Sequence, residues 1–231
     1  MRRPIGILAI GVLLVAATPA AFGGWAVITL ESLPAYLEVG TPTTLVFMVR
    51  QHGQTPLADL APTVSLQPRG ARLAFGASSV KAVAAGAPGR YSATIIAPDT
   101  GEVRITIDAN WRAARIALLP IRVALPGRAP AALMEPDRGR ELFVAKGCVT
   151  CHAKGDDREM LGRHELEIGP PLTGRQFPAE WLAGKLADPA RYRPAPDAWG
   201  MPDLGLNAQE IAALASYVNR PQTVAKAQTG R

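Results

Sequence analysis

Cys148, Cys151 and His152 are the residues of this chain whose types and spacing are best suited to chemistry. They belong to the run Cys148-Val149-Thr150-Cys151-His152, which contains both cysteines of the chain. A C-x-x-C-H run is the attachment pattern of c-type haem, in which two thiols form thioethers and the imidazole binds the iron. Because protein ligands set the potential of such an iron, the motif predicts a protein that carries electrons.

Three other uses of these residues compete with haem attachment. A structural zinc site takes four ligands, usually two cysteine pairs, whereas this chain has one pair and the histidines His52, His152 and His164. A redox-active dithiol should precede a helix in a βαβ unit, but here a helix-like segment comes before the motif. A disulfide across two residues closes too short a loop to stabilise the fold much. The pattern favours haem over all three.

The N-terminus matches an export signal, as haem attachment outside the cytoplasm requires. Arg2 and Arg3 precede an apolar stretch from Ile5 to Ala17, and small residues follow up to Gly23. We expect residues 1–23 to be a signal peptide cleaved near Ala21. A retained anchor is the alternative, because no charge occurs between Pro4 and Glu31. Either way we expect the protein in the periplasm or at the outer face of the cytoplasmic membrane.

The segments that must position the motif fall into two domains of different character. Residues 24–125 contain runs rich in β-branched and aromatic residues, separated by turns with Gly and Pro, and these runs predict a small antiparallel β-sandwich. The clearest expected strands are 25–30, 43–50, 90–96 and 103–110. The run Gly-Arg-Tyr-Ser-Ala-Thr, followed by a turn and an alternating strand, resembles an immunoglobulin-like module. That resemblance is to an architecture and implies no activity.

Residues 126–134 are rich in Pro and Gly and form the expected linker, and helical patterns follow over 135–221. The first expected helix has Pro136 in its first turn, continues through residues 138–145 and ends at Gly147, just before the motif. A second covers 179–187. Asn207 is expected to cap a third that extends to about Val218, with Glu210 completing a capping box. Residues 222–231 are polar and are expected to be a flexible tail.

From about Asp137 to Pro221 the chain resembles the class I cytochrome c family. Gly139 and Phe143 match a glycine and an aromatic residue of the family's first helix, and Leu214 and Tyr217 match paired positions on its last helix. The resemblance implies an all-α fold in which these helices cross closely at the glycine. Gly169-Pro170-Pro171-Leu172 is similar to the family's G-P-x-L segment. It implies that the Pro170 carbonyl accepts a hydrogen bond from the proximal imidazole of His152.

The resemblance also implies a methionine as the second axial ligand of a single haem c. Met201 lies 49 residues after His152 in a Pro-rich segment before the last helix, as that ligand does in the family. A thioether favours ferrous iron and raises the reduction potential. The sequence offers His164, Met160, Met134 and Met48 as alternative ligands, and we expect Met48 in the β-sandwich core. An open site is a further alternative.

Several residues near these motifs have two readings. Trp181, Tyr192 and Trp199 are suited to a haem pocket or to an ordinary core. Arg191 and Arg193 are suited to pairing with a haem propionate or to a solvated surface. The charged segment between His152 and Gly169 fits a solvated surface insertion better than a docking loop.

Charge is distributed unevenly between the domains. Residues 131–231 carry thirteen basic and thirteen acidic residues, whereas the β-rich region and linker carry ten basic and six acidic residues. This modest excess is able to steer the protein toward an acidic partner or an anionic membrane, or to serve solubility alone. We expect no nucleic acid as a partner. We expect no copper either, since the β-rich region offers only Met48 and His52 as ligands.

The sequence therefore predicts an electron-transfer protein rather than an enzyme, because we find no acid–base constellation beside a substrate pocket. Its first reading is a single-haem c-type cytochrome that moves electrons between respiratory or photosynthetic redox proteins. One alternative is a cytochrome subunit of a larger oxidoreductase, with the β-sandwich as assembly module. Another is a haem-based sensor in which Met201 does not bind the iron or is displaced by a ligand.

Overall fold

The structure is a computed structural model that describes residues 24–69, 78–155, 157, 160, 168–193, 195 and 200–220. The expected signal peptide and tail, and most of the charged segment after His152, lie outside these ranges. No helix within the described ranges has both the length and the apolar character needed to cross a membrane.

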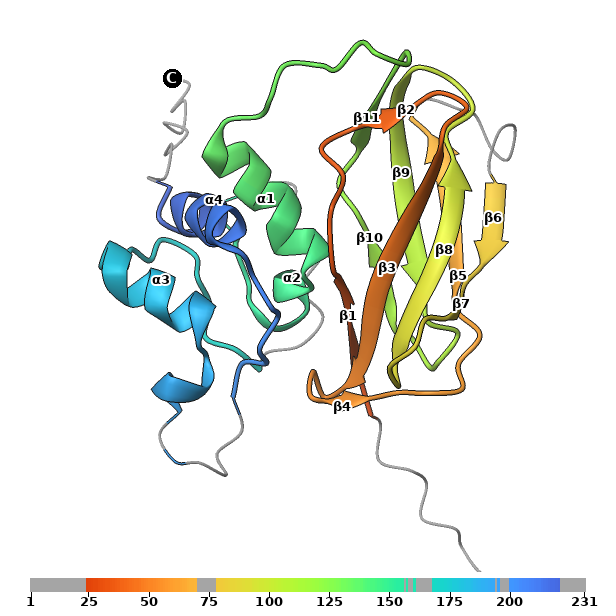
Figure 1. The fold of residues 1–231 in the computed structure, drawn as a ribbon. Coiled ribbons are helices and arrows are strands. Elements are labelled where there is room, and N and C mark those ends of the chain that lie inside the picture. The colour runs from red at the N-terminus through yellow and green to blue at the C-terminus, as the bar shows by residue number, and fades with distance from the viewer. Residues whose placement is uncertain are drawn as a thin grey trace, which may run out of the picture.

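The β-rich region consists of two sheets that face each other (Figure 1). One sheet has the order β1-β3-β8-β7, with β4 paired to β3, and the other has the order β2-β11-β9-β5-β6, with β10 paired to β9. The strands are β1 Ala26–Leu30, β2 Leu37–Glu38, β3 Pro42–Gln51, β4 Thr55–Pro56, β5 Thr63–Pro68, β6 Ser78–Lys81, β7 Val83–Ala84, β8 Arg90–Ile96, β9 Gly101–Asp108, β10 Arg115–Ala117 and β11 Ile121–Ala124. Strand pairing is antiparallel except between β11 and β2, which run parallel.

Alternation along the strands places one apolar row of each sheet in a shared core. On β3, Leu45, Phe47 and Val49 are buried, while the residues between them are half-buried. Met48 therefore points away from the sandwich core, contrary to our expectation, because side chains alternate between the faces of a strand with a period of two. The two-sheet β-sandwich is confirmed in this form, and β8 has the bounds expected from the sequence.

Strand β1 departs from this alternation, since all five of its residues are buried. Ala26, Ile28 and Leu30 belong to the apolar core. Val27 and Thr29 point the other way and are buried as well. Their burial follows from the position of β1, which lies between its own sheet and helix α1 (Glu135–Ala145) (Figure 1).

The region after the linker is helical, as the sequence predicts. Its elements are α1, α2 (Cys148–Cys151), α3 (Ala179–Ala187), the 3-10 helix η2 (Ala190–Tyr192) and α4 (Ala208–Val218). The expected capping box is present on α4: Asn207 Oδ1 accepts from the Glu210 N–H at 3.0 Å, and Glu210 Oε2 accepts from the Asn207 N–H at 3.2 Å. This box fixes where the last helix begins, and its cap, Asn207, lies six residues after Met201.

Helices α1 and α4 cross at Gly139. A Cβ atom on Gly139 would overlap the carbonyl oxygen of Ala213 and would lie 2.7 Å from Tyr217 Cβ. One turn away, the rings of Phe143 and Tyr217 pack with their centroids 5.5 Å apart. The close crossing expected from the family resemblance is therefore present, and only glycine fits at its centre.

The helices also pack against the β-sandwich through a small set of specific contacts. Lys146 is buried, yet its Nζ donates to the Glu31 carbonyl at 2.8 Å and pairs with Glu210 Oε1 at 2.7 Å. Arg138 donates to the Leu33 and Pro34 carbonyls. A buried ammonium is stable only when its donors are satisfied, so Lys146 ties the end of β1 to the start of α4.

Candidate haem site

The attachment motif sits on a short helix that is pressed against β1. Gly147 precedes α2 with a φ of +78°, which favours glycine. A Cβ atom on Gly147 would lie 2.5 Å from Val27 Cγ1 and 2.7 Å from the Ile28 carbonyl oxygen. Gly147 therefore ends α1, turns the chain into α2 and lets the motif approach the β-sandwich.

The two thiols of the motif are free and lie in apolar surroundings. Burial, together with the nearby Cys151 thiol, raises the pKa of the Cys148 thiol to about 12. Burial raises the pKa of Cys151 to about 11. Redox-active C-x-x-C cysteines have lowered thiol pKa values. The raised pKa values here disfavour a redox-active dithiol and suit cysteines that end as neutral thioethers.

His152 is held with one ring nitrogen directed to the backbone. Its Nδ1 lies 2.9 Å from the carbonyl oxygen of Pro170, which accepts the hydrogen bond and leaves the lone pair on Nε2. Burial lowers the pKa of His152, the positive charge of Lys185 lowers it further, and the bond to Pro170 opposes both. The neutral imidazole is the form that binds a metal.

Gly169 fixes the distance between the His152 ring and the segment that carries Pro170. A Cβ atom on Gly169 would lie 2.5 Å from His152 Nδ1 and 2.9 Å from the Cys151 carbonyl oxygen. The Gly169 N–H also donates to that carbonyl at 2.9 Å. The glycine of the Gly-Pro-Pro-Leu run is therefore needed for the close approach that lets Pro170 reach His152.

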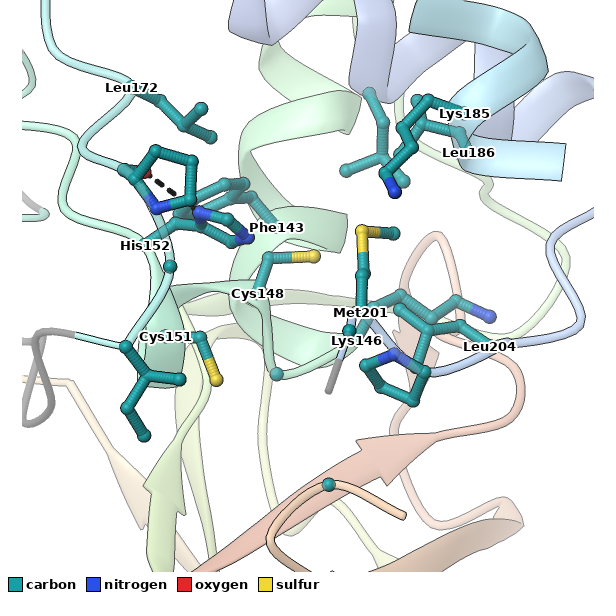
Figure 2. Close-up of a pocket in the computed structure, with 18 of the residues that line it drawn as sticks. Phe143, Lys146, Cys148, Cys151, His152, Leu172, Lys185, Leu186, Met201 and Leu204 are labelled. Atoms are coloured by element: carbon teal, nitrogen blue, oxygen red, sulfur yellow. Dashed lines mark hydrogen bonds between the residues drawn. The ribbon is translucent and has the colours of Figure 1, made fainter. Parts of the chain in front are cut away.

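Met201 and His152 line one cavity of about 360 Å³, together with Cys148 and Cys151. Figure 2 shows His152 and Met201 on opposite sides of this space, with the Cys148 thiol between them in this view. Most of the lining is apolar and includes Phe143 of α1, Leu172 of the loop before α3, Leu182 and Leu186 of α3, and Leu214 and Val218 of α4. The structure thus brings the four predicted attachment and axial residues together.

Of the described residues, the other methionines do not line this cavity. Met160 is buried, but in the core. Met134 is 68% exposed, and Met48 lies on β3. His164 lies outside the described residues. Met201 is therefore the methionine that shares a cavity with His152.

One side of the cavity carries positive charge. Lys185 on α3 lines it, and burial together with the nearby Arg193 lowers the pKa of Lys185. Arg193 packs on Gly200, where a Cβ atom would lie 3.1 Å from Arg193 Nε. Within the described part of the chain this buried Nε has no hydrogen-bond partner. Lys185 in the lining, and Arg193 with its unused donor behind Gly200, provide a place for an anionic group.

The aromatic residues expected near the haem divide between two roles. Trp181 lines the cavity while remaining 42% exposed, and it stacks on Phe177 at 5.4 Å between ring centroids. Tyr192 lies edge-on to Trp181 at 5.7 Å and does not line the cavity. Arg191 is exposed. Trp199 falls outside the described residues.

Four lining residues come from the β-sandwich and were not predicted from the sequence as part of the haem site. Trp25, Val27, His52 and Gly53 contribute a wall of the cavity. The rings of Trp25 and His52 lie 5.4 Å apart between centroids, and the His52 N–H donates to the Trp25 carbonyl at 3.0 Å. Nothing in the local sequence connects residues 25–53 to residues 148–201, so only the packing of the two domains reveals this wall.

Apart from one family, similarity to known proteins is weak. No curated protein matches this chain. Among solved structures, the C-terminal domain of ZirS is similar at 14% identity over 54% of this chain and 84% of that one, with a TM-score of 0.32. A superoxide reductase (neelaredoxin) from Ignicoccus hospitalis is similar at 13% identity over 42% of this chain and 80% of that one, with a TM-score of 0.29.

Domains 4 and 5 of the S-layer protein SbsC are similar at 15% identity and a TM-score of 0.29, over 42% of this chain. The match spans 44% of that structure. At TM-scores this low, none of these similarities defines a fold family or an activity.

The helical domain, in contrast, matches a known family. The family model of cytochrome c matches residues 136–220, which contain the attachment motif, Gly139, Pro170, Met201 and Tyr217. For these residues the match implies a covalently bound haem c with its iron and a role in electron transfer. Residues 136–220 therefore form a cytochrome c domain, joined at its N-terminal side to a β-sandwich.

Proposed function

We propose that this protein is an exported c-type cytochrome that transfers single electrons between redox proteins. Cys148 and Cys151 would carry the haem, His152 would bind the iron as proximal ligand, and Met201 would bind it from the other side. The observation that carries this proposal is the shared cavity. An oriented imidazole and a thioether face it from opposite sides, with two free thiols in its lining.

The residues present fit a haem in four respects. The cavity is mostly apolar, as a porphyrin requires, and both thiols are neutral. His152 offers Nε2 because Nδ1 is engaged by Pro170. Lys185 and the unused Nε of Arg193 are suited to the negative propionates. When bound, the haem supplies a centre that accepts and releases one electron.

The chain's own residues would tune that centre. The hydrogen bond to Pro170 orients the His152 ring and increases its donor strength. The soft thioether of Met201 opposes this effect by favouring the reduced metal. Apolar side chains such as Phe143 and Leu214 exclude water, so nearby charges act more strongly on the potential.

The setting of this activity follows from the chemistry of attachment. Haem is joined to C-x-x-C-H outside the cytoplasm, which supports export to the periplasm or to the outer face of the membrane. The partners would be a donor and an acceptor redox protein, meeting the cytochrome through small, short-lived interfaces. We propose electron transfer without catalysis by this chain alone. The β-sandwich would be immunoglobulin-like, an assignment supported by its two facing sheets.

An optical redox titration of the purified holoprotein tests this proposal, with Met201→Ala measured alongside it. We expect a low-spin haem of high potential whose ferric thioether-to-iron charge-transfer band disappears in the variant. Met160→Ala is the matched control, because Met160 is buried outside the cavity. A band that survives in Met201→Ala would remove Met201 as ligand. High-spin ferrous iron that binds carbon monoxide readily in the wild type would favour the sensor function instead.

A further inference from the structure

We propose that the turn His52-Gly53-Gln54 of the β-sandwich supports residues 200–203 and thereby holds Met201 in place as the distal ligand. This inference rests on the proposed function and assigns the β-sandwich a task within it. The sandwich would be a positioning element of the haem site. The turn joins β3 to β4, and its first two residues line the same cavity as Met201.

The turn has a fixed shape that suits a support. His52 and Gly53 have φ values of +53° and +72°, and the Gln54 N–H donates to the Gln51 carbonyl at 3.0 Å. Positive φ at both central residues is the geometry of a type I′ hairpin turn. The hydrogen bond from the His52 N–H to Trp25 fastens the turn to β1. Both ends of this turn are therefore held by the sheet.

Two contacts join the turn to the residues on either side of Met201. Gln54 Nε2 donates to the carbonyl oxygen of Gly200 at 3.2 Å. Gly53 is buried, and a Cβ atom on it would lie 3.7 Å from Pro202 Cγ. The segment that carries the thioether thus meets the turn both before and after the ligand.

Opposite charges near the turn also hold the β-sandwich against the segment that carries Met201. Arg50, at the end of β3, is largely buried, and one of its terminal nitrogens has no hydrogen-bond partner within the described residues. Burial lowers the pKa of Arg50, while the carboxylates of Asp203 and Glu31 raise it. Arg50 and Asp203 therefore attract each other across the domain boundary. Trp25 and Val27 complete the wall beside this contact.

A pair of matched glycine variants tests the support. Gly53→Asn keeps the turn accessible, because Asn tolerates positive φ, but it extends a side chain toward Pro202. Gly40→Asn makes the same change at φ +70°, where a Cβ atom would meet nothing within 4 Å. The measurement is the affinity of imidazole for the ferric holoprotein, read from the loss of the thioether band, together with the reduction potential.

We expect Gly53→Asn to bind imidazole more tightly and to have a lower potential than wild type, with Gly40→Asn unchanged. Gln54→Ala removes one hydrogen bond, so imidazole should bind about fivefold more tightly. Gln67→Ala, at an exposed position of β5, is its control. If Gly53→Asn destabilises the sandwich itself, its unfolding midpoint will be lower than that of wild type. The imidazole affinity of Gln54→Ala, which leaves the backbone unstrained, then decides whether the turn supports Met201.

The outcomes separate this inference from the proposed function. If the wild type shows the thioether band and loses it in Met201→Ala, but Gly53→Asn and Gln54→Ala bind imidazole like their controls, the support is refuted and the cytochrome remains. If the wild type shows no such band, the ligation of Met201 and the support are both refuted. Tighter imidazole binding confined to the two turn variants establishes the support.

Discussion

The backbone of Gly139 lies so close to the carbonyl group of Ala213 that no space remains for a β-carbon between α1 and α4. Both helices line the haem cavity, through Phe143 on α1 and Leu214 and Val218 on α4. Any change that separates them must therefore alter the walls of the cavity as well as the stability of the domain.

Replacing Gly139 by Ala should destabilise the holoprotein by about 3 kcal/mol, because the new methyl group meets backbone atoms that cannot rotate away. Gly184→Ala is a matched control within α3. There the added Cβ would meet the hydroxyl end of Tyr192, a side chain that can shift. We expect that variant to stay within about 1 kcal/mol of wild type, helped by the higher helix propensity of Ala. Denaturant unfolding followed by far-UV circular dichroism measures both, and equal losses would contradict the explanation.

Gly169→Ala should disturb the proximal side of the site. The added Cβ presses on the His152 ring and weakens the bond from Nδ1 to the Pro170 carbonyl. The imidazole then becomes a poorer donor, the ferric form loses stabilisation, and the potential rises. Loss of one such bond corresponds to a rise of about 40 mV. Spectroelectrochemistry measures the shift.

Haem content per protein must be measured in the same Gly169→Ala samples, because the crowding also affects the Cys151 carbonyl. Pro171→Ala, at the exposed neighbouring position, should leave the potential unchanged. A fully loaded Gly169→Ala protein with the wild-type potential would show that the Pro170 bond does not tune the site.

Glu31 should make the stability of the protein depend on acidity. Arg90 donates to both of its carboxylate oxygens, at 2.7 and 2.9 Å, and this pair lowers the pKa of Glu31. A lowered pKa in the folded state gives stability that is present above the unfolded pKa and is lost as the pH falls through the folded pKa. Glu31→Gln should therefore be less stable than wild type at pH 7.

The difference between Glu31→Gln and wild type should shrink as the pH falls below the ordinary Glu pKa of about 4.3 and through the lower pKa of the folded state. Thermal unfolding across this range measures it. Added salt should reduce the difference at pH 7, since the pair is partly exposed. A difference that stays constant with pH would mean that the charge of Glu31 plays no part.

The sequence predicted most of the helical domain because its determinants are local. The capping box of Asn207 and Glu210, the break at Gly147 and the glycine of the helix crossing each depend on a few neighbouring residues. The run from Gly169 to Leu172 likewise predicted the bond between His152 and Pro170, which the structure contains. These features follow from short-range backbone chemistry together with a family resemblance.

The wall formed by Trp25, Val27, His52 and Gly53 could not be predicted from the sequence. These residues read as an ordinary strand and turn, and their role arises only when two domains pack together. The prediction that Met48 lies in the sandwich core was wrong for a simpler reason. A run such as Leu45-Val46-Phe47-Met48-Val49 is apolar at every position, so it does not show which face is buried.

The proximal and distal sides of the cavity differ in the sequence separation of the residues that contact each other there. His152 and Pro170 are 18 residues apart, whereas Gln54 and Gly200 are 146 apart. Closing a longer loop costs more chain entropy, and contacts of long sequence separation form late in folding. We therefore expect the proximal half to assemble early and the distal half to wait for the domains to dock. The β-sandwich thus sets the order in which the site assembles: Met201 would be the last ligand to reach its position during folding and the first to lose it during unfolding.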